Sequence, residues 1–243
     1  MSATTKGHLL DGRVRYTQPS GGFRSGIEPV LLAASIAVRS GQRVLEGGAG
    51  AGAGLLCLAL RFPGLQGIGI EIDPGQVALA CMNATANGMD GLSFIAGDIE
   101  AVVPDSVFDH AFANPPYHLA AGTASPNAAR ARAKQGQSDL LAAWATALGR
   151  PLRYRGTLTF VLPAAHLPAC IAAMAAASCP ADVILPLWPK PGVPAKLTIV
   201  RGIKNGRGAM RLLPGLTLHD SRSRFTPAAD AIVRGGGALK LDH

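Results

Sequence analysis

The sequence of 243 residues has few cysteines and few aromatic residues, and it lacks long apolar runs. No apolar run approaches the roughly 18 residues of a membrane span, and the first residues lack the apolar centre of a signal peptide. The six histidines show no metal-ligand spacing, and no CxxC pair occurs. We therefore expect a cytoplasmic protein without metal or membrane contact, whose four cysteines are buried thiols: Cys57, Cys81, Cys170 and Cys179.

Acidic side chains are scarce in the second half of the chain. Residues 1–121 carry 7 basic and 10 acidic side chains, a net charge of −3, whereas residues 122–243 carry 16 and 5, a net charge of +11. A basic surface on one side is expected in a protein that binds a polyanion such as RNA, because neutralising the phosphates releases their counterions. Solubility is the alternative explanation. With 48% apolar and only 16% charged residues, the chain can still form a substantial core.

A strand, a glycine-rich turn and a helix follow one another from residue 43. Residues 43–46 form a short apolar strand, GGAGAGAG follows, and LLCLALRF is typical of a helix. Glycines let the backbone turn tightly and bring a ligand close to the helix N-terminus. The next strand ends at Glu71, about 20 residues further on, where a carboxylate can accept hydrogen bonds from both hydroxyls of a ribose. This spacing predicts a nucleotide site.

The glycines alone do not separate NAD from S-adenosylmethionine (SAM), because the pattern also fits a dinucleotide fingerprint. An acidic residue at the end of the first strand, Glu46, suits a ligand with an ammonium group and would repel a pyrophosphate. A further acid after the third strand, Asp98, lies where an adenine amine can be bound. We therefore expect SAM, held by Glu46, Gly48, Gly50, Gly52, Glu71 and Asp98.

The fourth strand ends in the run Asn114-Pro115-Pro116-Tyr117. The two prolines lack backbone donors and hold Asn114 extended at the carboxyl end of the strand. The Asn114 side chain and a neighbouring carbonyl can then accept hydrogen bonds from one exocyclic amine, and the Tyr117 ring can stack on its base. We assign the four residues to catalysis, Asn114 also to the cofactor site and Tyr117 also to substrate binding. A lone Pro-Pro pair would indicate only a strand end.

Strands that begin near residues 43, 66, 92 and 109 alternate with helices, which predicts a doubly wound parallel sheet with ligands at the carboxyl ends of its strands. Three further strands are expected at 156–162, 182–187 and 196–200. We expect one domain over residues 1–243, with an N-terminal entrance segment and helix at 1–42 and a C-terminal extension at 203–243.

Glu46 to Gly52, Glu71, Gly97-Asp98 and the NPPY motif together resemble the class I SAM-dependent methyltransferases of the NPPY type. The segments QPSGGFRSGIEPVLLAAS and LPLWPKPGVPAKLTIV resemble the bacterial tRNA(Val) (adenine-N6)-methyltransferases over nearly the whole chain. The resemblance implies a Rossmann-like α/β fold with a mainly parallel seven-stranded sheet, helices on both faces and an antiparallel last strand. It also implies methyl transfer from SAM to the exocyclic amine of an adenine in a tRNA anticodon loop.

Other functions fit parts of the same pattern. Protein-glutamine N-methyltransferases share the NPPY chemistry, because an amide also offers two N–H groups, and they carry an extra helical domain ahead of the glycine turn. An rRNA or DNA base N-methyltransferase, an NAD-binding protein and an RNA-binding module without catalysis are further alternatives.

Residues 118–137 are small and polar, with three cations and no acid. We interpret this stretch as a basic loop beside the site whose Arg130, Arg132 and Lys134 contact the RNA substrate. Lys204, Arg207 and Arg211 extend the basic surface and are weaker candidates for such contacts.

Overall fold

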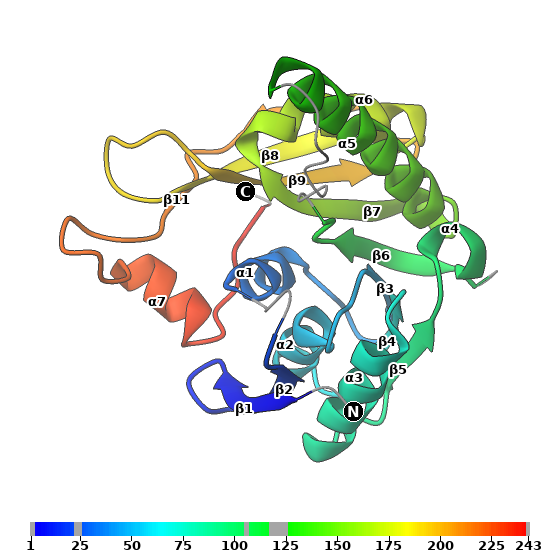
Figure 1. Ribbon diagram of the computed structural model, residues 1–243, viewed down its shortest axis with the longest axis vertical. Helices are drawn as coiled ribbons and strands as arrows, with labels where there is room; N and C mark the ends of the chain where they lie inside the picture. Colours follow the sequence, from blue (N-terminus) through cyan, green and yellow to red (C-terminus); the bar gives the residue numbers. More distant parts are fainter. Residues whose placement is uncertain (1–2, 22–25, 105–106, 117–125, 242–243) are drawn as a thin grey trace.

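The computed structural model describes residues 3–21, 26–104, 107–116 and 126–241, and for residues 126–135 and 137 it describes the backbone alone. A central twisted sheet has helices on both faces (Figure 1). Within these residues the sheet has nine strands in the order β10-β8-β9-β7-β6-β3-β4-β5, and β11 also pairs with β8. The strands are β3 (Arg43–Gly47), β4 (Gln66–Glu71), β5 (Leu92–Ala96), β6 (Phe108–Ala113), β7 (Leu152–Pro163), β8 (Ala181–Trp188), β9 (Leu197–Ile203), β10 (Arg211–Leu212) and β11 (Leu216–Thr217).

The strand directions confirm the predicted fold class. β9 is antiparallel to both of its neighbours, β7 and β8, whereas the other pairings are parallel. The seven predicted strands are all present, and β9 is the expected antiparallel one. The two-residue strands β10 and β11, which add to the outer edge of β8, were not predicted because they are too short to show a period in the sequence.

Two layers of helices cover the sheet, one on each face (Figure 1). One buried cluster contains side chains of α1, α2 and α7, and the other contains side chains of α5 and α6. The helices are α1 (Glu28–Ser35), α2 (Ala53–Arg61), α3 (Pro74–Ala86), α4 (Ile99–Val102), α5 (Pro126–Gly149), α6 (Leu167–Ala176) and α7 (Pro227–Val233), with a 3₁₀ turn, η1, at Ala164–His166.

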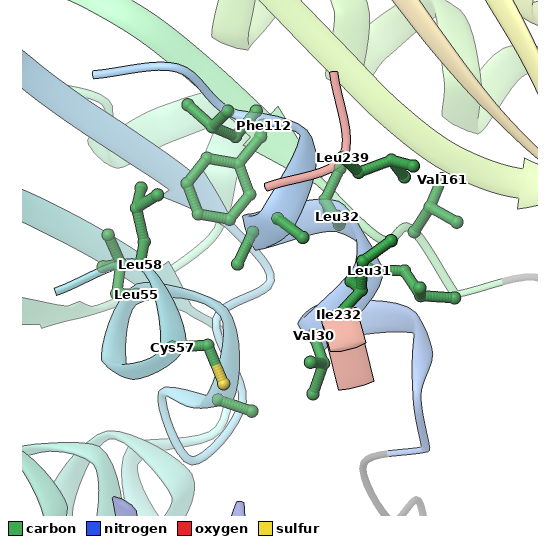
Figure 2. Close-up of a cluster of buried hydrophobic side chains, with 14 of the residues drawn as sticks. Val30, Leu31, Leu32, Leu55, Cys57, Leu58, Phe112, Val161, Ile232 and Leu239 are labelled. Carbon is green, nitrogen blue, oxygen red and sulfur yellow. The ribbon is translucent and has the colours of Figure 1, made fainter. Parts of the chain in front are cut away.

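Helix α1 is the centre of the first cluster (Figure 2). Its Leu31 and Leu32 are fully buried, and every residue from Pro29 to Ser35 is shielded from solvent. The C-terminal segment closes over this helix, because Ile232 of α7 and Leu239 belong to the same cluster and the Leu239 N–H donates to the Ala34 carbonyl at 2.8 Å. Part of the C-terminal extension therefore packs on the N-terminal helix.

A two-stranded antiparallel hairpin, β1 (Thr4–Leu9) and β2 (Val14–Pro19), precedes α1. Asn83 of α3 and Asn87, which caps the C-terminus of that helix, hold the second strand of the hairpin. The Asn83 side chain accepts from the Thr17 N–H at 2.8 Å and donates to the Thr17 carbonyl at 2.9 Å, and Asn87 makes the same pair of bonds with Arg15 at 2.9 and 2.7 Å. Asn83 also donates to the Ala51 carbonyl in the glycine turn at 2.9 Å. The hairpin and the glycine turn are thus fastened to one helix.

Two local expectations are corrected by the structure. The basic stretch after the NPPY motif is helical from Pro126 onward, because proline suits the first position of a helix and alanine, arginine and lysine all have high helix propensity. Residues 126–137 of the expected loop therefore begin a 24-residue helix, and residues 118–125 lie outside the described residues. Cys81 is exposed on α3, whereas the other three cysteines are buried as expected.

The described residues contain neither a membrane-spanning helix nor a metal site. No helix there is both long and apolar enough to cross a membrane. Nor does any group of three or more histidine, cysteine, aspartate or glutamate side chains come together as a metal site.

Candidate active site

Four adjacent parallel strands bring the predicted site residues to one edge of the sheet. In the register, Gly47 of β3 lies beside Ala113 of β6 and Ile70 of β4, and Glu71 of β4 lies beside Ala96 of β5. Asn114, the glycine turn, Glu71 and Asp98 therefore follow one another across the carboxyl ends of β6, β3, β4 and β5. At about 4.8 Å between neighbouring strands, the row spans about 14 Å.

The glycine turn after β3 requires glycine at its alternate positions. Gly48, Gly50 and Gly52 have φ angles of +64°, +55° and +89°, in the left-handed region that disfavours other residues. A Cβ on Gly48 would also lie 2.7 Å from the ring of Trp144, which comes from α5. The Ala49 N–H donates to the Ile70 carbonyl at 3.0 Å, so the turn is fixed against β4.

Glu71 is buried at the end of β4 and holds the turn from the other side. One carboxylate oxygen accepts from the Gly50 N–H at 2.9 Å and the other from the Asp73 N–H at 3.0 Å. A carboxylate has about four acceptor positions, so each oxygen can accept one more hydrogen bond. Glu71 is therefore oriented by the backbone and keeps the capacity to accept from the two hydroxyls of a ribose.

Glu46 lies behind the turn, against the first turn of α2. Its carboxylate accepts from the Leu55 N–H at 3.0 Å and contacts Gly54, where a Cβ would displace it. Burial raises the pKa of Glu46 to about 8; the Leu55 hydrogen bond opposes this rise, and the negative charge of Glu71 adds to it. At neutral pH the folded chain therefore holds Glu46 mainly as the neutral acid. Its predicted contact with an ammonium group remains a prediction.

Two aspartates near the row act as helix caps. Asp98 is exposed and accepts from the Glu100 N–H at 2.9 Å, which starts α4. Asp73 accepts from the Gly75 and Gln76 N–H groups at the start of α3. Capping engages one oxygen of Asp98, so the rest of the carboxylate can still accept from an adenine amine.

Asn114 directly follows β6, as the two prolines require. Its side chain is half-buried, while Pro115 is buried and Pro116 is exposed. Tyr117, the fourth residue of the motif, lies outside the described residues. The structure therefore places Asn114 in the row next to the glycine turn and leaves the stacking role of Tyr117 a prediction.

The predicted RNA contacts fall on two different parts of the fold. Arg130, Arg132 and Lys134 belong to the first turns of α5; their side chains are not described. Trp144 of the same helix contacts Gly48, so by a rise of 1.5 Å per residue these cations lie about 15 to 20 Å along α5 from the glycine turn.

The weaker candidates lie at the opposite edge of the sheet. Lys204 and Arg207 follow β9, which is antiparallel and so ends where the other strands begin, and Arg211 pairs with Val183 at the start of β8. Lys204 donates to the Ala177 carbonyl at 3.3 Å and Arg211 to the Leu241 carbonyl at 3.0 Å. These cations are therefore not neighbours of Asn114.

Sequence reasoning missed two lysines at the same edge as Asn114. Lys190 and Lys196 lie in the connection between β8 and β9. Because β8 is parallel to β6, this connection leaves the sheet at its carboxyl edge. The expected antiparallel pairing of the last strand was the signal that could have placed them there.

Comparison with known proteins agrees with this geometry. Residues 38–141 match a family model described as a methyltransferase domain. A release factor glutamine methyltransferase from Rhodospirillum rubrum is 40% identical over 117 residues, which are 45% of this chain and 36% of that protein. A tRNA1(Val) (adenine(37)-N6)-methyltransferase from Vibrio campbellii is 29% identical over 143 residues, 58% of this chain and 59% of that protein. The chain thus matches less than two thirds of the length of either relative.

A crystal structure of a predicted O-methyltransferase from Agrobacterium tumefaciens has the same fold, with a TM-score of 0.73 and 22% identity over 89% of this chain and 100% of that one. The family model covers the strand–glycine turn–helix unit and the strand ends that carry Glu71, Asp98 and Asn114. Residues 38–141 thus match the methyltransferase-domain model, and the chain shares the fold of the Agrobacterium structure.

Proposed function

We propose that this protein transfers a methyl group from SAM to the exocyclic amine of an adenine in RNA, in the anticodon loop of a tRNA, and that it acts in the cytoplasm as one domain. The observation that carries the proposal is the row of Asn114, the glycine turn, Glu71 and Asp98 along one edge of the sheet. Along the row lie an acceptor for the target amine, a turn for the amino-acid part of SAM, an acceptor for its ribose and an acceptor for its adenine. Bound SAM and its target would need these groups in this order.

The residues present fit SAM. Glu71 has its two oxygens fixed by backbone N–H groups and can accept from both ribose hydroxyls, and Asp98 can accept from the adenine amine. The glycine turn lets the backbone come close to the methionine part. The Glu46 carboxyl group behind the turn would accept from the ammonium group. Bound SAM would supply an electrophilic methyl group on a sulfonium.

The chain's own residues would position the nucleophile. The exocyclic amine of adenine is a weak nucleophile because its lone pair is delocalised into the ring. The Asn114 side-chain oxygen and the Pro115 carbonyl would accept its two hydrogens, which favours the rehybridised nitrogen and the charge that develops on it. Tyr117 would stack on the base and so offset part of the cost of removing it from its own stack, about a few kcal/mol.

The charge distribution favours RNA as the substrate. Residues 122–243 carry a net charge of +11. The match to the Vibrio tRNA methyltransferase extends over 58% of this chain, against 45% for the Rhodospirillum glutamine methyltransferase. The 40% identity of the latter nevertheless favours a second candidate function, methylation of a glutamine side chain in a protein.

Transfer of radiolabelled methyl from SAM separates the two candidates. Purified protein is incubated with unmodified total tRNA in one reaction and with a peptide chain release factor in another. We expect label in tRNA and N6-methyladenosine among its nucleosides. Label in the release factor alone would establish the second candidate, and label in neither would refute both.

Replacement of Glu71 tests the cofactor site. In Glu71→Gln one oxygen remains to hold the turn, but a charged acceptor for ribose is removed, so SAM affinity should fall by roughly tenfold. In Glu71→Ala both oxygens are removed, and the fall should reach roughly a hundredfold because Gly50 also loses its anchor. Titration calorimetry measures both variants, with the exposed Glu100→Gln as the matched control. Wild-type affinity in Glu71→Ala would contradict the assignment.

Neutralising the start of α5 tests its contact with the RNA backbone. In the Arg130→Ala/Arg132→Ala/Lys134→Ala variant, RNA affinity should fall for all RNA sequences alike, because phosphate contacts carry no sequence information. The slope of log K against log salt should shrink by about 0.7 to 0.9 for each phosphate that is no longer neutralised. The matched control removes three cations at the opposite edge, Lys204, Arg207 and Arg211. An unchanged slope in the α5 variant would show that these cations are merely solvated.

A further inference from the structure

A pair of adjoining hollows lies where two loops meet at the carboxyl end of β8. The first, of about 370 Å³, is formed by the β8–β9 connection together with His219 and Ser223. The second, of about 410 Å³, shares those two residues and continues to α7. In Figure 1 the β8–β9 connection (yellow) and the loop that leads to α7 (orange) lie near each other at this end of the sheet. The two loops thus form one surface.

Two lysines without an acidic partner in the described part of the chain line the first hollow. Its lining includes Lys190, Lys196, Ser223 and His219. Among the described residues, neither lysine has a carboxylate within ion-pair distance. In the second hollow the arginines are paired, Arg224 with Asp220 at 2.9 Å and Arg234 with Asp230 at 3.1 Å. The first hollow is therefore the one that lacks a counter-anion.

The loop opposite the lysines has a fixed shape. The Leu218 N–H donates to the Trp188 carbonyl at 2.7 Å and the Thr226 N–H to the Leu218 carbonyl at 2.9 Å. Within the loop, Asp220 accepts from the Arg222 and Arg224 N–H groups at 2.9 and 3.0 Å. The His219 ring stacks on Phe225, with 4.9 Å between centroids, and lies 3.3 Å from the Pro189 carbonyl through Nδ1. The lysines therefore share the hollow with a loop of fixed shape that includes Ser223.

The hollow is within reach of the active site. β8 is separated from β6 by β9 and β7, so its carboxyl end lies three strand spacings, about 14 Å, from the strand end that carries Asn114. Both strands point to the same edge of the sheet. A few nucleotides of single-stranded RNA can span this separation when the target base is at Asn114.

We propose that the hollow between Lys190, Lys196 and Ser223 binds a phosphate of the RNA backbone a few nucleotides from the methylated adenine. This proposal rests on the proposed function and names a contact that function requires. Two ammonium groups supply the charge, and the hydroxyl supplies a neutral donor, which together suit the two unesterified oxygens of a phosphodiester. Because a phosphodiester has no sequence information, the hollow would position the loop and not select its bases.

The test compares two double variants with the same change in charge. Lys190→Ala/Lys196→Ala changes the hollow, and Arg39→Ala/Arg150→Ala removes two exposed cations just before β3 and β7, at the opposite edge of the sheet. We expect the first variant to bind tRNA roughly fivefold to thirtyfold more weakly, with a raised KM for tRNA, an unchanged kcat at saturating tRNA and unchanged SAM affinity. Its salt slope should shrink by about 0.7 to 0.9. The second variant should match wild type in each quantity, and circular dichroism should show both folded.

The other outcomes overturn the proposal in distinguishable ways. Equal reductions in affinity in both variants would show that only the overall charge matters. Unchanged tRNA affinity in Lys190→Ala/Lys196→Ala, with wild-type protein methylating tRNA, would refute the hollow and leave the proposed function intact. Weaker binding of inorganic pyrophosphate with unchanged tRNA affinity would assign the hollow to a free phosphate compound. Failure of wild-type protein to methylate any RNA would refute the proposed function together with this contact.

Discussion

Asn114→Ala should lower single-turnover methyl transfer by at least about a hundredfold while SAM affinity stays within about threefold of wild type. The side chain sits at the end of β6, beside the glycine turn, where its oxygen would accept from the attacking amine. Loss of one preorganised group at developing charge typically costs about 10² to 10³ in rate. Rapid quenching with labelled SAM and excess enzyme measures the chemical step alone.

The Asn114→Asp variant tests whether the rate depends on the acceptor oxygen or on the whole amide group. An aspartate keeps an acceptor oxygen at the same position, so it should retain a larger share of the rate than alanine does. A rate within about threefold of wild type in Asn114→Ala would mean that the acceptor contributes under about 1 kcal/mol. The proposed mechanism would then be wrong even if the methyltransferase activity were established.

Glu46→Gln should stabilise the cofactor-free protein, and by more as pH rises. In the folded chain the pKa of Glu46 is raised from 4.5 to about 8, chiefly by burial, so the folded state binds this proton more tightly than the unfolded state. The stability that the bound proton provides is complete below pH 4.5 and is lost as pH rises toward 8, at about 1.4 kcal/mol per pH unit. Glutamine has no such titration and keeps an oxygen for the Leu55 N–H.

Urea unfolding of both proteins at pH 5, 7 and 9 measures the difference. The gap in free energy of unfolding should widen from pH 5 to pH 8 and then level off, reaching on the order of 3 to 5 kcal/mol. The exposed Glu100→Gln variant is the control and should follow wild type at each pH. A constant gap between pH 5 and 9 would show that Glu46 does not hold its proton in the folded chain.

Much of the candidate site could be predicted because its signals are local. Glycines at positions 48, 50 and 52 and the prolines after Asn114 end strands β3 and β6 for steric reasons that no distant contact changes. The apolar strands then fix which edge of the sheet the residues share. The row therefore follows from strand order, which the alternation of strands and helices predicts.

The parts that sequence reasoning missed depend on contacts between distant segments. The hollow at Lys190 and Lys196 exists because a loop about 30 residues further on folds back over the β8–β9 connection. The first turns of α5 have no apolar period, so their sequence predicts a loop although they form an alanine-rich helix. The engagement of Glu46 with α2 likewise depends on Gly54, whose missing Cβ leaves room for the carboxylate.

Asn83 and Asn87 cover the open edge of the N-terminal hairpin. β2 pairs with β1 along one side, which leaves the N–H and C=O groups of Arg15 and Thr17 pointing outward. Such an open edge is a template on which a second chain can add a strand and start an aggregate. Asn83 and Asn87 occupy these groups with side-chain amides, as the neighbouring strand of a larger sheet would. A helix thus protects this edge from intermolecular pairing at the positions next to the glycine turn.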